Sequence, residues 1–540
     1  MGGAAGRRRL LVALWFVATW LGAAAGDAAT ASVDGRRAVA STGEDFVCAT
    51  LDWWPPEKCD YGTCAWGRAS LLNLDLSNKV LLNAIKAFSP LTLRLGGSLQ
   101  DKVVYGTADL RQPCTPFVKN DKEMFGFTQG CLPMRRWDEL NAFFRKSGAK
   151  IVFGLNAFNG KVLMPDKSLK GPWDYTNAAS LIRYTVNKGY KIHGWELGNE
   201  LSGGGVGARV AADQYSADVI GLKSIVDKIY QGNPSKPLVL APGGFFDNAW
   251  FTELIAKTKP NLLNVVTHHI YNLGAGVDTH LMERILDPSY LDGMASTFSN
   301  LQGILKSAGT STVAWVGEAG GAYNSGHHLI TDAFVFSFWF LDQLGMSAKY
   351  DTKSYCRQSL IGGNYGLLNT TTFQPNPDYY SALLWHRLMG TKVLATTFSG
   401  TNKIRAYAHC AKDSTGITLL LINLSGNTTT QVSVTSEGAA AAHKHGLKKH
   451  SRKTRHVHVP GFSGFAEAAG AMRNEYHLTP KDGNLQSQVM LLNGRALATD
   501  ADGNIPRFEA VKVDAAQPIT VAPYSIVFSH IPHFSVPACS

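Results

Sequence analysis

Charged side chains are scarce in this chain of 540 residues, at 17% of the total, whereas hydrophobic residues make up 45%. This balance excludes an intrinsically disordered chain and a long coiled coil, which are both rich in charge. The 54 glycines and 22 prolines are scattered, which excludes collagen-like and low-complexity sequences. Internal repeats are also lacking, and the length exceeds what one hydrophobic core normally holds. We therefore expect a large globular domain joined to a smaller one.

The surplus of positive charge, formally +11, is concentrated in two short segments. Three arginines at 7–9 and six Lys or Arg residues between 444 and 455 account for nine of these charges. The rest of the chain is nearly balanced. Nucleic-acid binding needs a basic surface that extends over the contact, so we expect no nucleic acid among the partners.

The first 25 residues have the order of a secretory signal peptide. Arg7–Arg9 precede an apolar run, Leu10–Leu21, and small residues follow it. A membrane anchor is the alternative, but the run is shorter than the ~20 residues of a helical span, and no later segment is apolar enough. We expect a signal peptide over 1–25 and a protein secreted to the extracellular space or cell wall. The alternative location is the lysosome or vacuole, peripheral to the membrane.

Eight cysteines and three glycosylation sequons agree with export from the cell. An even number of cysteines suits an oxidising compartment. Cys59 and Cys64 lack the paired CxxC spacing of zinc ligands, so we expect no structural metal. The sequons predict N-glycosylation at Asn369, Asn423 and Asn427.

Short apolar runs alternate with amphipathic helical stretches over the first two thirds of the chain. The expected strands are Phe46–Trp54, Leu91–Gly97, Lys150–Phe158, Ile192–Glu200, Leu238–Gly244, Asn264–Tyr271, Thr312–Gly321 and Met346–Tyr355. Such strands, buried on both faces, predict a parallel sheet. Eight units predict an α/β fold, a (β/α)8 TIM barrel over 45–388. An open doubly wound sheet is the alternative, but Asp52–Pro56 stands where its glycine-rich phosphate loop would follow the first strand.

The pattern changes near residue 389, and short alternating strands with turn signals replace the helices. The expected strands are Thr391–Ser399, Lys403–Cys410, Gly416–Leu424, Thr429–Val434, Ser487–Leu492 and Ser525–His530. This pattern predicts an all-β sandwich domain over 389–540. A loop at 438–460 interrupts it and carries the second basic cluster.

Two glutamates stand where expected barrel strands end, Glu200 after the fourth and Glu318 after the seventh. Active sites of such barrels lie at these strand ends, and strands four and seven are three positions apart in a ring of eight. We therefore expect the two side chains to lie roughly 5–5.5 Å apart, as an acid and a nucleophile for glycosidic cleavage. Asn199 is placed to bind a sugar hydroxyl. Glu196 is expected to be a buried, hydrogen-bonded structural group, and Asp52 a loop cap or a sugar ligand at the same rim.

Several motifs beyond these glutamates are shared with a known family. They are Leu93–Gly97, Phe153–Ala157, Trp195–Glu200, His268-His269, Val316–Glu318, Leu341–Gly345 and Gly362–Tyr365. On these motifs the sequence resembles the heparanase-like β-glucuronidases of clan A glycoside hydrolases, especially the plant heparanase-like proteins. The resemblance covers most of the chain after the signal peptide.

The resemblance implies a retaining double displacement with Glu200 as acid/base and Glu318 as nucleophile, without a cofactor or metal ion. Arg94 would bind near the nucleophile, Asn199 would touch the 2-hydroxyl, and Tyr365 with the backbone around Gly363 would hold the uronate. At least one of the paired histidines at 268 and 269 should face the site. With the strand-end residues, the expected substrate-binding set is Asp52, Arg94, Ser98, Asn199, His268, Tyr271, Gly363 and Tyr365.

The sequence departs from the family pattern in places. Asn324-Ser325 stands where animal heparanases have a glycine pair that helps hold the uronate, and the strand-six tyrosine comes one place later, as Tyr271. The segment between Tyr105 and Cys131 is too short to resemble the excised linker of animal heparanase, so we expect a single-chain enzyme. The resemblance also implies a disulfide between Cys410 and Cys539; the other pairings stay open.

The expected function is that of a secreted retaining glycoside hydrolase that cleaves β-linked glucuronic acid from a polysaccharide, proteoglycan or small glucuronide. One alternative is a clan A hydrolase for another sugar, such as a xylanase or arabinofuranosidase. Another is a catalytically silent protein that binds acidic polysaccharides. The basic cluster, His443–His458, is either a solvated loop or a contact with an acidic cell wall or membrane surface.

Overall fold

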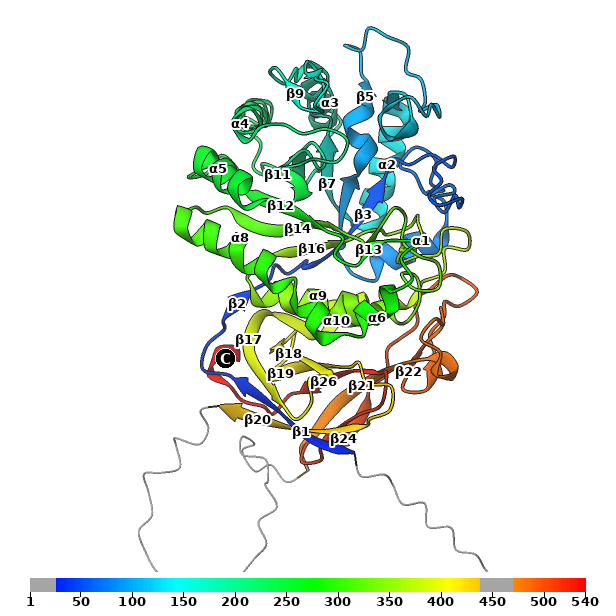
Figure 1. Ribbon diagram of the computed structural model, residues 1–540, viewed down its shortest axis with the longest axis vertical. Coiled ribbons are helices and arrows are strands. Elements are labelled where there is room, and N and C mark those ends of the chain that lie inside the picture. Colours follow the sequence, from blue (N-terminus) through cyan, green and yellow to red (C-terminus); the bar gives the residue numbers. More distant parts are fainter. Residues whose placement is uncertain (1–25, 438–469) are drawn as a thin grey trace, which may run out of the picture.

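The computed structural model describes residues 26–437 and 470–540. It has two stacked parts, a barrel of parallel strands surrounded by helices and an all-β part below it in the view of Figure 1. The expected signal peptide, 1–25, and the expected basic loop, 438–460, lie outside the described residues. Within the described ranges no helix is long and apolar enough to cross a membrane.

Eight parallel strands close into a barrel, and the predicted fold is confirmed. They are β3 (Val47–Asp52), β4 (Thr92–Gly96), β7 (Lys150–Leu155), β10 (Gly194–Leu197), β11 (Leu238–Phe245), β12 (Val265–Ile270), β14 (Val313–Ala319) and β16 (Ser354–Arg357). The order around the ring follows the chain, and β16 pairs with β3 to close it. Nearly all of these residues are buried because side chains fill the interior and helices cover the outside.

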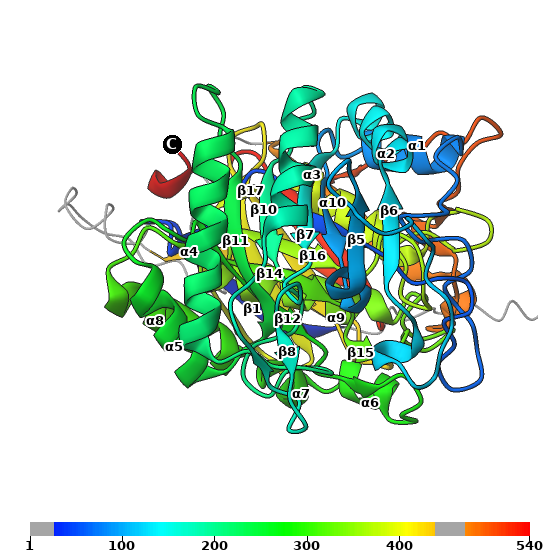
Figure 2. The same ribbon diagram turned by 90° about the horizontal axis from the view of Figure 1, so that it is seen from above.

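Helices link the strands and cover the barrel on its outside, as the view from above shows (Figure 2). They are α1 (Lys79–Lys86), α2 (Met134–Ser147), α3 (Thr176–Asn187), α4 (Ala212–Ile229), α5 (Asn248–Thr258), α6 (Leu281–Ile285), α7 (Pro288–Asp292), α8 (Ala295–Ala308), α9 (Phe336–Lys349) and α10 (Pro377–Leu388). Short strand pairs lie in the loops: β5 (Val103–Gly106) with β6 (Gly130–Pro133), β8 (Val162–Leu163) with β9 (Leu169–Lys170), and β13 (Gly274–Ala275) with β15 (Ala322–Tyr323).

The eighth barrel strand begins later than the sequence predicted. The expected strand, Met346–Tyr355, was wrong at its start, because residues up to Lys349 belong to α9 and the strand itself is β16. α9 lies between the barrel and the all-β part, and every residue from Phe336 to Ala348 is buried (Figure 1). A helix buried on all sides has no amphipathic period, so its last turn resembles a buried strand in sequence.

The all-β part is a long sheet that folds over its own hydrophobic core. Its strands are β1 (Asp27–Asp34), β2 (Ala40–Ser41), β17 (Met389–Ser399), β18 (Ile404–Ala411), β19 (Ile417–Asn423), β20 (Thr430–Glu437), β21 (Met472–Pro480), β22 (Met490–Leu492), β23 (Arg495–Ala496), β24 (Val511–Asp514), β25 (Ile519–Val521) and β26 (Ile526–Ile531). β1 comes from before the barrel and pairs with both β17 and β20. We had expected the β-sandwich to be confined to 389–540, but it also includes β1 from before the barrel.

β19 shows why the two parts are packed together. Its side chains alternate between two faces, as they do in any strand. Leu419 and Leu421 enter the core of the all-β part, whereas Leu420 and Ile422 join the large core shared with the barrel. All four side chains are buried, so the strand is apolar on both faces.

Four disulfides tie the described chain together. The predicted bond between Cys410 and Cys539 is confirmed and fixes the C-terminal residues to β18. Cys48 bonds to Cys356 and links β3 to β16 at the closure of the barrel. The remaining bonds are local, Cys59 with Cys64 and Cys114 with Cys131.

The structure contradicts one of the three glycosylation expectations. Asn423 is fully buried, and its amide nitrogen donates hydrogen bonds to the carbonyls of Thr428, Val521 and Ala522. A glycan on this nitrogen would have to displace all three contacts. Asn427 is exposed and Asn369 is half-buried, so both can carry a glycan.

Candidate active site

A cavity of about 330 Å³ lies at the ends of the barrel strands, and we call it the mouth cavity. Its walls come from the ends of the strands and from the loops that follow them. The lining residues are Asp52, Trp54, Lys58, Asp60, Trp66, Ser98, Glu200, Val206, Phe245, Tyr271, Glu318, Tyr323, Asn324, Ser325, Gln358 and Tyr365. The mouth cavity occupies the place where barrel enzymes carry their active sites.

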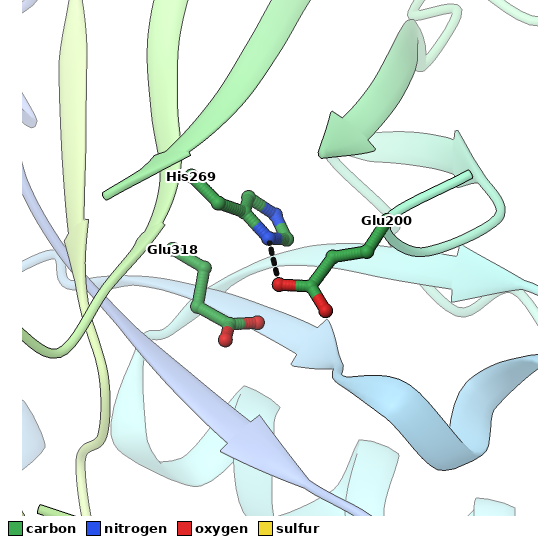
Figure 3. Close-up of side chains that lie close together, drawn as sticks. All are labelled: Glu200, His269 and Glu318. Atoms are coloured by element: carbon green, nitrogen blue, oxygen red, sulfur yellow. Dashed lines mark hydrogen bonds and ion pairs between the residues drawn. The ribbon is translucent and has the colours of Figure 1, made fainter. Parts of the chain in front are cut away.

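Glu200 and Glu318 face one another across the mouth cavity. Glu200 follows β10, and Glu318 lies on β14. One carboxylate oxygen of each lies within 4.8 Å of the other and of a ring nitrogen of His269 (Figure 3). The predicted meeting of these two glutamates is confirmed.

Glu200 lies in an environment that favours its protonated form. The side chain is buried, with 7% of the residue exposed, and no ion pair with Lys or Arg is formed to it in the described chain. Burial raises the pKa of Glu200 to about 7, and the charge of Arg94 only partly opposes this. Its Oε1 shares a 3.0 Å hydrogen bond with Nδ1 of His269, whose own pKa burial lowers to about 4. The histidine is therefore neutral at pH 7.

Glu318 accepts a hydrogen bond on each of its carboxylate oxygens. Arg94 Nη1 donates to its Oε2 over 2.6 Å, and the hydroxyl of Tyr271 donates to its Oε1 over 2.6 Å. Hydrogen bonds to a charged group are stronger than neutral ones, so both contacts stabilise the carboxylate. The two glutamates thus have unlike surroundings, which is what an acid and a nucleophile require.

Arg94 connects the residues beneath the mouth cavity. It is buried on β4, and its guanidinium also donates to Glu196 Oε2 over 2.7 Å and to Asn199 Oδ1 over 2.9 Å. Glu196 accepts a second bond from Thr267, so the prediction of a buried, hydrogen-bonded group is confirmed. Because the oxygen of Asn199 faces Arg94, its amide N–H groups are the part left to bind a sugar hydroxyl.

Asp52 lines the mouth cavity at the end of β3. Its Oδ2 accepts from Gln358 over 3.0 Å, while Oδ1 is buried without a partner among the described residues. Burial and the neighbouring charge of Glu318 raise the pKa of Asp52 well above its usual range. Gly97 has a φ of +92°, and a Cβ there would lie 2.6 Å from Asp52 Oδ2, so only glycine lets the turn before Ser98 approach this carboxyl.

Tyr365 lines the mouth cavity, whereas Gly363 lies behind it. A Cβ on Gly363 would lie 2.7 Å from the ring of Tyr365, so the glycine lets the ring pack closely. The expectation that Gly363 itself lines the site is not met. Trp66 holds the other side of the ring, with centroids 6.1 Å apart in an edge-to-face arrangement.

His268 points away from the mouth cavity, and its place in the expected substrate-binding set was wrong. Its buried ring packs edge-to-face against Phe298 of α8, and neither ring nitrogen has a described partner. Side chains alternate along a strand, so His269 is the one that faces the site. The register between β12 and β14 shifts at this point and sets His269 beside Glu318.

Sequence reasoning missed a group of polar residues on the rim. Lys58, Asp60 and Trp66 lie on the loop after β3. Ser325, which the sequence comparison had singled out at the position of the family's glycine pair, follows β15 and lines the mouth cavity with them. Loops carry no periodic pattern, so hydrophobic periodicity could not indicate these residues. The closely spaced Cys59 and Cys64, which form a disulfide, were the signal that this loop has a fixed conformation.

The cluster of Glu200, His269 and Glu318 has the spacing of a metal site as well as that of a hydrolase. Nδ1 of His269 bonds to Glu200 and both oxygens of Glu318 accept from Arg94 and Tyr271, whereas Nε2 of His269 has no partner among the described residues. This arrangement suits proton transfer and stabilisation of positive charge at a sugar carbon.

Comparison with known proteins places this geometry in a family. Residues 28–345 match the model described as glycosyl hydrolase family 79, N-terminal domain. The chain is 58% identical over 511 residues to heparanase-like protein 3 of Arabidopsis thaliana, covering 95% of this chain and 94% of that protein. It is 46% identical over 509 residues to baicalin-beta-D-glucuronidase of Scutellaria baicalensis, covering 92% and 90%.

The fold has solved counterparts. A 4-O-alpha-L-rhamnosyl-beta-D-glucuronidase from Fusarium oxysporum aligns with a TM-score of 0.62 at 15% identity, over 93% of this chain and 100% of that one. This similarity supports the barrel and the C-terminal sheet domain. Membership of the family rests on the family model and on the sequence relatives. The chain therefore belongs to the heparanase-like glycosyl hydrolase family 79 and is an O-glycosyl hydrolase.

Proposed function

We propose that the protein is a retaining β-glucuronidase that releases β-linked glucuronic acid from glycans or glycosides. Glu200 is the acid/base and Glu318 the nucleophile. The observation that carries the proposal is the separation of their carboxylate oxygens, which lies within 4.8 Å. Retaining enzymes hold their two carboxyl groups about 5–5.5 Å apart, whereas inverting enzymes leave about 6.5–9.5 Å for a water molecule.

The first step forms a covalent glycosyl ester. Glu318 attacks the anomeric carbon while protonated Glu200 gives its proton to the leaving oxygen. Arg94 and Tyr271 fix the oxygens of Glu318, and the burial of Glu200 keeps its proton in place below about pH 7. In the second step ionised Glu200 removes a proton from water, the resulting hydroxide oxygen bonds to the anomeric carbon, and Glu318 leaves.

The proposed substrate class is a glucuronide borne by a polysaccharide, a proteoglycan or a small molecule. A sequence relative supports it by name, the baicalin-beta-D-glucuronidase of Scutellaria baicalensis. Within the mouth cavity, Asp52, Ser98 and Tyr365 supply polar groups for the sugar ring. The amide of Asn199 is assigned to the 2-hydroxyl.

We also propose that the protein is secreted to the extracellular space or cell wall. The order of residues in 1–25 and the four disulfides of the described chain support export through an oxidising compartment. A C-terminal fluorescent fusion followed in intact tissue separates the apoplast from the vacuole.

Chemical rescue by azide tests the two roles. With a dinitrophenyl β-glucuronide, Glu318→Ala should regain turnover in azide and form the α-glucuronyl azide, because azide replaces the nucleophile. Glu200→Ala should form the β-glucuronyl azide, because azide then attacks the covalent intermediate. Glu283→Gln, in an exposed glutamate of α6, serves as the control and should leave turnover unchanged. Failure of both rescues, or the opposite anomers, would overturn the assignment.

A panel of aryl glycosides tests the sugar. Hydrolysis of an arabinofuranoside or xyloside without hydrolysis of the glucuronide would reject the substrate class but keep the glycosidase. Absence of turnover on every sugar, with retained binding of acidic polysaccharide, would instead indicate a silent binding protein.

A further inference from the structure

The mouth cavity is strongly acidic for a site that has to receive an anionic sugar. Four carboxyl groups line it, on Asp52, Asp60, Glu200 and Glu318, and Lys58 is the one Lys or Arg side chain among its lining residues. Arg94 lies beneath, engaged with Glu196, Glu318 and Asn199. A uronate brings a further negative charge, so a cation within the cavity would favour its binding.

Lys58 is held in a defined position without being enclosed. Its Nζ lies 2.7 Å from Asp60 Oδ1 and 4.5 Å from the centroid of the Trp54 ring, and 19% of the side chain is exposed. The disulfide between Cys59 and Cys64 closes the loop that carries it. A surface lysine would lose much of its freedom on binding a ligand, whereas this one is already positioned.

Asp60 links Lys58 to the part of the cavity that holds the sugar ring. Oγ of Ser325 donates to Asp60 Oδ2 over 2.5 Å and accepts from Nε1 of Trp66 over 2.8 Å. Trp66 in turn packs against the ring of Tyr365. The charges of Asp52, Glu318 and Asp60 add to burial in raising the pKa of Tyr365, which shows that this group of residues is compact.

Two apolar lining residues of the mouth cavity, Val206 and Phe245, adjoin the acid/base. Val206 donates its backbone N–H to the carbonyl of Glu200 over 2.9 Å, and Phe245 packs against the rings of His269 and Tyr271. The leaving group has to lie beside Glu200, because that residue protonates the leaving oxygen. The polar lining residues Tyr365, Ser325 and Asp60 are linked by contacts that lead to Lys58, and we assign this part of the cavity to the uronate.

We propose that Lys58 is the residue that recognises the carboxylate of the substrate's uronic acid, with Asp60 holding its ammonium group in place. This inference rests on the proposed β-glucuronidase function. An ammonium group has three N–H donors, so Lys58 can keep its bond to Asp60 while it binds the uronate by a charge-assisted hydrogen bond. Lys58 would thereby determine the preference for a uronic acid over the matching neutral sugar.

The test compares an aryl β-glucuronide with its methyl ester, in which the carboxylate is masked. Lys58→Met keeps a straight side chain against Trp54 and removes the charge. We expect kcat/KM for the free acid to fall about 10- to 100-fold, chiefly through KM, and that for the ester to change less than threefold. Lys58→Arg should restore most of the activity on the acid. Lys150→Met, at another lysine paired with an aspartate but outside the mouth cavity, is the matched control and should behave as the wild type.

The outcomes separate the two proposals. Suppose that the wild type hydrolyses the glucuronide. If Lys58→Met lowers kcat/KM equally for the acid and the ester, or lowers it for neither, the assignment of Lys58 is wrong while the proposed function stands. If the wild type hydrolyses only neutral glycosides, the proposed function itself fails. Should Lys58→Met not fold, Lys58→Gln carries the same expectation, because the end of this side chain is partly exposed.

Discussion

Arg94 Nη1 lies 2.6 Å from Oε2 of Glu318, while Oε1 of Glu200 bonds to the ring of His269, which is neutral at pH 7. One buried cation therefore distinguishes two glutamates that face the same cavity. Arg94 also bonds to Glu196 and Asn199, so the orientation of Glu318 and that of the amide beside Glu200 both depend on a single side chain. This contact and the burial of Glu200 are the physical basis of the roles that we propose for the two residues.

The pH dependence of turnover should report the pKa of Glu200. Burial raises this pKa to about 7, so the acid is protonated below that pH and is lost above it. We expect kcat/KM on a poorly activated glucuronide to decline on a basic limb centred near pH 7. A profile that stays flat up to pH 9 would contradict the role of this carboxyl as the acid.

Stability should also depend on pH through the same residue. Folded Glu200 keeps its proton up to about pH 7, whereas the unfolded chain releases it near its ordinary value of 4.5, so the folded state binds more protons between these limits. The free energy of unfolding therefore falls as pH rises through this window, by up to about 1.4 kcal/mol per pH unit for one such group. Glu200→Gln should make the slope shallower by up to that amount, as measured by urea denaturation at pH 5, 6 and 7. An unchanged slope would mean that the buried carboxyl is not protonated.

Tyr271→Phe removes a donor to Glu318 and keeps the ring. A hydrogen bond to a charged group contributes about 1.5–3 kcal/mol, so we expect the rate of the glycosylation step to fall about 10- to 100-fold. Pre-steady-state kinetics with a dinitrophenyl glucuronide measure this step. The melting temperature should change little, and an unchanged rate would show that Arg94 alone suffices to hold the nucleophile.

The bond between Cys410 and Cys539 should contribute to the stability of the all-β part. It closes a loop across 129 residues, which corresponds to roughly 4–5 kcal/mol in the chain-entropy account. Replacing both cysteines with serine should lower the melting temperature measured by calorimetry. Because both lie far from the mouth cavity in the fold, kcat at 25 °C should be preserved.

Glycan mapping of protein expressed in a eukaryotic host should distinguish the three sequons. We expect glycans on Asn427 and on Asn369 and none on Asn423, whose amide nitrogen is buried and bonded. Mass spectrometry of peptides after enzymatic deglycosylation in water enriched in ¹⁸O gives the occupancy. A fully occupied Asn423 would contradict the described packing of β19.

Local patterns in the sequence were enough to predict the barrel, the change to an all-β part and the two glutamates at strand ends. Continuous apolar runs mark strands that are buried on both faces, and the chain order of a closed barrel then fixes which strand ends meet. Glu200 and Glu318 could be paired in this way because their distance depends on topology rather than on detailed packing. The motifs around them indicated the family without knowledge of the fold.

Tertiary structure decided what depends on the phase of a strand or on contacts between distant segments. Whether His268 or His269 faces the site depends on a register shift between β12 and β14, which no repeating pattern encodes. Two features arise only when segments far apart in the chain pack together. One is the insertion of β1 between β17 and β20, and the other is the presence of Lys58 and Ser325 in the wall of one cavity. The sequence thus determined which strands and strand ends exist, and packing determined which side chains face one another, because hydrophobic periodicity is local and orientation is not.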